Sequence, residues 1–134
     1  MLGNILDFNN LTQENIFVLD SPILSNSQFK KFKKLFAKKI KKIDCTFNVE
    51  ETLKDNLQRI KEESQISVRE GFTTLILSDK NVSREKLAIP MLLSVGAIHT
   101  HLVKLKLRGY VSINAQTGEA LDTHSFATLI GVGA

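Results

Sequence analysis

The spacing of apolar residues in the second half of the chain predicts two strands separated by a long helix. Thr73–Leu77 is a short apolar and partly β-branched run, which fits a strand covered on both faces. From Pro90 to Leu107 apolar side chains continue almost all the way round a helix, with proline in the first turn, where a missing N–H is tolerated. Gly109 is expected to end that helix. Tyr110–Ala115 then has the composition of a second strand.

A polar turn separates this second strand from a final helix. The turn spans residues 116–119, and Gly118 is expected to take a positive φ there. Asp122 or Thr123 is a suitable N-cap, and the helix is expected to reach Ile130.

The first half of the chain repeats the alternation of helix and strand. Ser25 or Asn26 can cap a short helix whose apolar residues fall three and four positions apart, and Ile43–Phe47 alternates apolar and polar residues as a strand does. Asn48 and Glu51 have the spacing of a capping box for the next helix, which Gly71 would end. The residues expected to be buried in these two helices are Phe29, Phe32, Leu35, Phe36, Leu53, Leu57 and Ile60.

This order of elements predicts an α/β fold, because strands that alternate with helices pair in parallel through right-handed crossovers. We expect a partial parallel βαβαβα unit over residues 27–134, preceded by an irregular N-terminal arm over residues 1–26. The chain has 134 residues, which suffices for one domain but is short for a barrel of eight strands. No apolar run approaches the length of a membrane span, and residues 1–10 lack the pattern of a signal peptide.

The basic character of the chain is local. The net charge is +4, but Lys30–Lys42 holds eight of the eighteen basic residues and no acidic residue, so the remainder is net acidic. One interpretation is a nucleic-acid-binding module in which these lysines contact phosphates. The other is a solvated surface, which we favour because the lysines straddle a helix end and a strand start and no aromatic stacking platform lies among them.

Polar residues follow two neighbouring strands at the carboxyl edge of the predicted sheet, where α/β proteins bind ligands. These candidate site residues are Asp79, Lys80, Gln116, Glu119 and His124. A small enzyme would use Asp79 with His99 or His124. The alternative is that Asp79 only accepts backbone hydrogen bonds within its loop, which we favour because no phosphate-binding glycine loop accompanies it.

Neither the histidines nor the single cysteine predicts a metal site. His99 and His101 are two residues apart on a helix and point about 200° away from each other, so one ion does not easily take both. We expect one imidazole to be packed and the other to lie at the surface. Cys45 lies in a strand pattern and is expected to be an inert, buried thiol.

Several separate motifs resemble one known family. They are LILSDK with its loop to IPMLL, then AIHTHLVKLKLR and TGEALDTHSFATLIGVGA, with a looser match through SPILSNSQF and IDCTF. In order and spacing they resemble the central region of the large subunit of glutamate synthase, the ferredoxin- or NADPH-linked enzyme that makes glutamate from glutamine and 2-oxoglutarate. Three positions depart from the family pattern: Thr100 replaces a usual histidine, Lys106 a usual glycine and Val132 a usual aromatic residue.

The resemblance implies a function for the chain as part of a larger enzyme. Members of the family have an amidotransferase domain with an N-terminal cysteine nucleophile, this central region, and an FMN-binding barrel with an iron–sulfur cluster. The central region resembles that barrel in architecture, so the fold is expected to be part of a TIM-like barrel. It carries no cofactor and helps to join the two active sites.

None of the catalytic motifs of that family maps onto this chain, where position 2 is Leu2 and no flavin loop is present. We therefore expect no catalytic, cofactor-binding or metal-binding residue here and a scaffolding role, in bacterial cytoplasm or plastid stroma. The expected partners are the other domains and, through them, ferredoxin or an NADPH-linked subunit.

Overall fold

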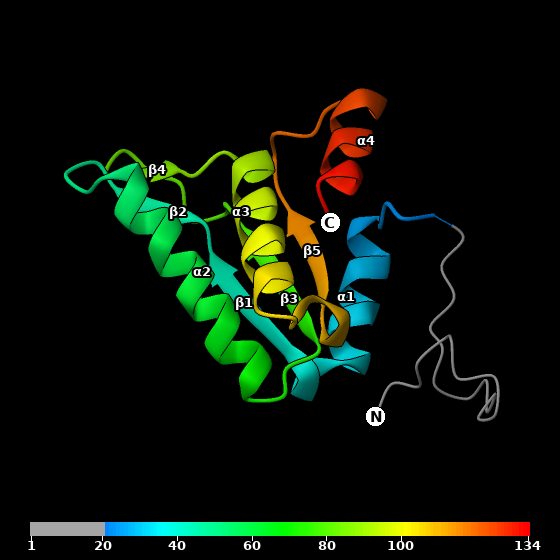
Figure 1. Ribbon diagram of the computed structural model, residues 1–134. Coiled ribbons are helices and arrows are strands. Elements are labelled where there is room, and N and C mark those ends of the chain that lie inside the picture. The colour runs from blue at the N-terminus through cyan, green and yellow to red at the C-terminus, as the bar shows by residue number, and fades with distance from the viewer. Residues whose placement is uncertain (1–20) are drawn as a thin grey trace, which may run out of the picture.

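The computed structural model describes residues 21–134, so most of the expected N-terminal arm lies outside the described residues. The described part has the predicted α/β architecture (Figure 1). Its elements are α1 (Asn26–Leu35), η2 (Ala37–Lys39), β1 (Ile40–Asp44), β2 (Thr46–Asn48), α2 (Leu53–Arg69), β3 (Thr74–Ser78), β4 (Lys86–Ala88), α3 (Met91–Lys104), η3 (Arg108–Tyr110), β5 (Ser112–Gln116) and α4 (Thr123–Gly131).

Three parallel strands form the central sheet, in the order β1-β3-β5. This confirms the predicted parallel unit, and the strands form an open sheet rather than a closed barrel. Figure 1 shows α2 and α3 side by side over one face of the sheet, with α4 beyond β5. Because each helix connects one parallel strand to the next, the carboxyl ends of all three strands meet at one edge of the sheet.

The core lies between this sheet and the helices that cover it. All five residues of β3 are buried, as expected for a central strand with a neighbour on each side. The fully buried side chains that meet there include Ile43, Ile60, Leu75, Leu77, Ile98 and Leu102. Leu75 and Leu77 of β3 and one face of α3 therefore share one core, whereas Leu92, Leu93 and Val103 on the rest of that helix are exposed.

The first strand is displaced from the predicted range Ile43–Phe47. β1 begins at Ile40 and contains Lys41 and Lys42, and the chain leaves the parallel sheet at Cys45 to pair β2 with β4 in a small antiparallel ribbon. Lysines are acceptable in β1 because it is an edge strand, where long charged side chains reach solvent. This ribbon is not evident from the sequence pattern.

Arg59 fixes the point at which the chain changes sheets. Its guanidinium, on α2, donates to the backbone carbonyls of Asp44 at 3.1 Å and Thr46 at 2.9 Å, on either side of Cys45. Hydrogen bonds from a charged donor stabilise more than neutral ones. The junction between β1 and β2 is therefore anchored to the helix that covers it.

The caps of the first two helices differ in how well they were predicted. Ser25 caps α1 in a capping box with Gln28, which confirms the predicted start. For α2 the prediction was wrong: the N-cap is Thr52, which accepts from the N–H of Asp55. Asn48 and Glu51 do bind each other, but in the turn before the helix.

The expected apolar face of α1 is only partly buried. Phe32 is buried with 8% of its surface exposed, whereas Leu35 is 68% exposed. Phe32 packs between Phe29 and Phe36, at centroid distances of 6.4 Å and 5.0 Å. Leu35 was therefore wrongly assigned to the core.

Lys106, not Gly109, ends the long helix. α3 stops at Lys104, and Lys106 has φ +58°, the left-handed conformation that favours glycine. The N–H of Lys106 bonds to the carbonyl of Val103 at 2.9 Å and the N–H of Leu107 to that of Leu102 at 2.8 Å. These two bonds define a Schellman motif, in which only one residue must adopt a positive φ. Gly118 was predicted to have a positive φ, and that prediction was wrong.

Candidate functional site: the carboxyl edge of the parallel sheet

Asp79 joins the loops that follow β3 and β5. Its Oδ2 accepts a short hydrogen bond from the Thr117 hydroxyl and a second, at 3.3 Å, from the Gly118 N–H. The Thr117 hydroxyl oxygen in turn accepts from the Glu119 N–H at 3.0 Å. The carboxylate therefore holds the polar turn after β5 in place. Bonds within its own loop were expected, but these partners lie in a different loop and one of them is a side chain.

Glu119 occupies the position where a helix would bind an anion. Its Oε2 accepts from the N–H of Met91, the first residue of α3, at 2.9 Å. Helix N-termini attract negative charge because their first N–H groups lack partners within the helix. A carboxylate of the chain itself thus occupies one of the N–H groups that a phosphate or carboxylate ligand would use.

The other predicted residues contribute less to this edge. Gln116 accepts a long hydrogen bond, 3.4 Å, from the Ser78 hydroxyl, and the Lys80 side chain is exposed. His124 lies exposed in the first turn of α4, which Asp122 caps. Within residues 21–134 no hydrogen bond joins His124 to Asp79 or Glu119. The structure therefore brings Asp79, Glu119 and Gln116 to one edge. Lys80 joins them only through its backbone N–H, which donates to the Ser78 hydroxyl at 3.4 Å.

Asp44 belongs to the same edge and was missed because β1 was placed three residues too late. Its carboxylate accepts from Asn81 at 2.7 Å and from the N–H and hydroxyl of Thr46 at 3.0 Å and 2.8 Å. Burial alone would raise the pKa of Asp44, but these hydrogen bonds outweigh it and hold the pKa below the ordinary 3.8. Asp44 is therefore ionised and serves as a bridge between two loops.

The three carboxylates of this edge are all bound to groups of the chain itself. Asp44, Asp79 and Glu119 each accept from a backbone N–H, and the first two also accept from side chains. These bonds fix the loops at the end of the sheet.

His99 and His101 lie on different sides of α3, as their spacing predicts. Nδ1 of His99 accepts from Nε of Arg108 at 3.1 Å, and Nε2 of His101 pairs with Gln65 of α2 at 2.9 Å. Burial, followed by the nearby positive charge of Lys61, lowers the pKa of His101. The expectation that one imidazole lies at the surface was wrong, because both are partly buried and each has a partner.

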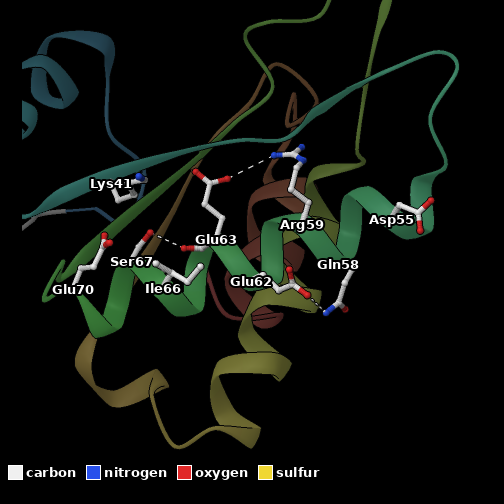
Figure 2. Close-up of a pocket in the computed structure, with 9 residues that line it drawn as sticks. All are labelled: Lys41, Asp55, Gln58, Arg59, Glu62, Glu63, Ile66, Ser67 and Glu70. Carbon is white, nitrogen blue, oxygen red and sulfur yellow. Dashed lines mark hydrogen bonds and ion pairs between the residues drawn. The ribbon is translucent and has the colours of Figure 1, made fainter.

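A shallow groove runs along the side of α2 that borders β1 (Figure 2), with a volume of about 460 Å³. Two pairs of its side chains contact each other: Gln58 donates to Glu62 at 2.6 Å, and Nη1 of Arg59 lies 3.6 Å from Oε2 of Glu63. The remaining lining residues are Lys41, Asp55, Ile66, Ser67 and Glu70. Figure 2 shows the residues of α2 spread along the helix rather than directed at one point, with Lys41 contributed by β1.

Comparison with known proteins identifies the family. The family model described as "Glutamate synthase central domain" matches residues 1–134. The chain belongs to the glutamate synthase central domain family. It is 44% identical to the NADPH-type glutamate synthase large chain of Azospirillum brasilense over 136 aligned residues, which cover 99% of this chain and 9% of the relative.

Two further relatives are similar to the chain over most of its length. The NADPH-type large chain of Bacillus subtilis is 41% identical over 87% of this chain, and the chloroplastic ferredoxin-dependent enzyme of Spinacia oleracea is 37% identical over 98%. In both cases the chain covers 8% of the relative's length. This glutamate synthase segment thus spans less than a tenth of the proteins it matches.

Cys45 of this glutamate synthase segment does not resemble a nucleophile. It is fully buried where β1 gives way to β2, and burial raises the pKa of its thiol to about 11. As the single cysteine of the sequence it also cannot supply the several thiolates that an iron–sulfur cluster needs. Among residues 21–134, no group of three or more histidine, cysteine and acidic residues is arranged to hold a metal ion.

The lysine run is distributed over α1, η2 and β1. The ammonium group of Lys33 lies 4.8 Å from the centroid of the Phe29 ring, and that of Lys41 lies 5.9 Å from the centroid of the Phe72 ring. Two of the lysine ammonium groups thus make cation–π contacts with aromatic side chains of the domain itself.

None of the helices in the described residues 21–134 has both the length and the apolar composition of a membrane span.

Proposed function

We propose that this chain is a scaffolding segment of a glutamate synthase, which links the amidotransferase and FMN-binding domains and carries no catalytic group of its own. The observation that carries the proposal is the hydrogen bonding of Asp44, Asp79 and Glu119 to the chain itself, at the edge where an α/β enzyme would bind substrate. The family match supports a role within a larger enzyme, because the relatives named above are many times longer than this chain.

In this role the chain connects reaction centres and helps to line the internal path along which ammonia passes between them. A linking element must keep its shape while chemistry proceeds on either side. The hydrogen bonds at the carboxyl edge, from Asp44 to Asn81 and from Asp79 to Thr117, support that requirement because they join loops on neighbouring strands.

The parent enzyme supplies FMN, the iron–sulfur cluster and the contact with ferredoxin or an NADPH-linked subunit through its other domains. The buried Cys45 and the occupied carboxylates do not fit such groups, so no step of the reaction is assigned to this chain. Its place is the bacterial cytoplasm or the plastid stroma, as part of the whole enzyme.

A matched pair of substitutions in the intact large chain tests the proposal. Asp79→Asn removes the charge, and Thr117→Val removes the hydroxyl that Asp79 binds while leaving the carboxylate. If Asp79 only holds the loop, both variants lose stability to a similar extent and keep glutamine hydrolysis and glutamate formation within about threefold. If Asp79 is a catalytic base, only Asp79→Asn loses activity, by about 10²-fold or more.

The isolated 134-residue chain provides a second test. Under this proposal it neither hydrolyses glutamine nor retains FMN after gel filtration. A flavin absorption spectrum that stays with the purified chain, or glutaminase activity above that of a Cys45→Ser control, would contradict the scaffolding role.

A further inference from the structure

We propose that the outer side of α1 binds the phosphate backbone of double-stranded nucleic acid without reading its base sequence. This activity goes beyond the scaffolding role and does not depend on it. Three observations carry the proposal: the lysines of α1 share one side of the helix, no carboxylate of the described residues pairs with them, and the aromatic side chains of the same helix point the other way.

The lysines of α1 gather on one side of the helix. Lys30, Lys31 and Lys34 are all exposed, and they fall within an arc of about 100° because successive helical residues are about 100° apart. These three residues are named the α1 lysine face. The whole lysine run crosses a helix end, which favours a solvated surface, but this part of the run lies on one helix and on one side of it. Lys38 and Lys39 of η2, both exposed, extend the positive charge beyond the end of α1.

The α1 lysine face has no internal counter-charge among the described residues. The sequence contains no acidic residue between positions 21 and 43. Within residues 21–134 the one ion pair joins Arg59 to Glu63, which both belong to α2. The positive charge of the face is therefore available to an anion from outside the domain, and the attraction acts over several ångströms of solvent.

The aromatic side of α1 is used inside the domain. Phe29, Phe32 and Phe36 lie opposite the α1 lysine face, none of them is exposed, and Phe32 packs against the other two. A basic amphipathic helix binds a membrane by inserting its apolar side, and that side is not available here. Proteins that bind single strands stack bases on exposed aromatic rings, which this surface does not offer.

A protein partner fits this surface less well than a phosphate backbone does. Protein interfaces are depleted in lysine and depend on a central group of apolar or aromatic side chains. On α1 the exposed large apolar side chain is Leu35 alone, which does not make such a centre. Lysine ammonium groups bind phosphates as point charges, and contacts of this kind carry no sequence information. The expected ligand is therefore duplex nucleic acid, bound with a Kd of about 10⁻⁴–10⁻⁶ M at physiological salt.

The salt dependence of binding tests the proposal. The 134-residue chain is titrated into a fluorescein-labelled DNA duplex of about 20 base pairs and mixed sequence, and anisotropy gives Kd between about 50 and 200 mM sodium chloride. Three phosphate contacts predict a slope of about −2.7 for the logarithm of the binding constant against the logarithm of the salt concentration. The double variant Lys30→Gln/Lys34→Gln should make this slope shallower by about 1.8 and weaken binding at least about 10-fold at the lowest salt.

A matched double variant separates the α1 lysine face from the net charge of the chain. Lys54→Gln/Lys104→Gln removes two exposed charges from α2 and α3, and it should keep the slope and change Kd by less than about threefold. Glutamine is nearly as good a helix former as lysine, and circular dichroism melts check that both variants remain folded.

Three results would overturn the proposal. The first is equal weakening by the two double variants, which would mean that net charge alone drives binding. The second is a slope shallower than about −1 for the unaltered chain. The third is tighter binding, at the same salt, to vesicles containing about 30% phosphatidylserine or to polyglutamate, which would assign the face to a lipid surface or to an acidic protein. Duplex binding is independent of catalysis, so failure here would leave the scaffolding proposal standing.

Discussion

The helix end at Lys106 leads to an unusual prediction, namely that a glycine substitution stabilises the domain. Lys106 adopts φ +58° at the position after the C-cap of α3, where the Schellman bonds from Lys106 to Val103 and from Leu107 to Leu102 are formed. A left-handed conformation costs a residue with a Cβ about 1–2 kcal/mol, and glycine is free of that cost. Glycine loses more backbone entropy on folding, which offsets roughly 0.5–1 kcal/mol of the gain.

The net expectation for Lys106→Gly is a gain of about 0.5–1 kcal/mol in the free energy of unfolding. For a domain of this size that corresponds to a rise in melting temperature of roughly 2–4 °C. Urea denaturation followed by circular dichroism measures the change, with an unaltered m-value as evidence that both proteins unfold in the same way.

Two control substitutions separate the backbone effect from the loss of a charge. Lys106→Ala removes the ammonium group but keeps a Cβ, so it should change stability by less than about 0.5 kcal/mol. Lys104→Gly places glycine in the last residue of α3 and should destabilise by up to about 1 kcal/mol. A destabilising effect of Lys106→Gly, or equal stabilisation by Lys106→Ala and Lys106→Gly, would contradict a backbone cost at this position.

Three further predictions concern a helix cap, a carboxylate and the thiol. Thr52→Ala should lower the free energy of unfolding by about 1 kcal/mol because it removes the N-cap of α2, whereas Thr52→Ser should retain most of it; urea denaturation decides. Asp44→Asn should lower the melting temperature at pH 7. The difference in melting temperature between variant and parent should shrink as the pH falls below 3.8 through the lowered folded-state pKa, because protonation of Asp44 then removes the same charge; thermal melts at pH 2–7 test this. Cys45 should resist iodoacetamide at pH 8 in the native chain and react rapidly in urea, because its pKa is raised to about 11; equal rates in the two states would contradict its burial.

The sequence by itself determined the class of fold and the order of the main elements. The short, mostly apolar run at residues 73–77 indicated a buried strand, and the apolar stretch after Pro90 indicated a long helix, because both signals depend on composition and period alone. The caps Ser25 and Asp122 were likewise visible, because a cap is a local interaction between residues three positions apart. The positions of Asp79 and Glu119 after their strands followed from the same pattern.

What only the tertiary structure decided was where elements end and which groups bind one another. Lysine has a low strand propensity, yet Lys41 and Lys42 lie in β1. Pairing with β3 along the whole strand outweighs this weak local preference. Lys106 ends α3 although Gly109 is the better local choice, since burial of Leu102 and the packing of Leu107 against the core fix the position of the turn. The partners of Asp44, Glu119 and Arg108 lie at sequence separations of up to 37 residues, and such contacts exist only once the sheet and its helices have packed.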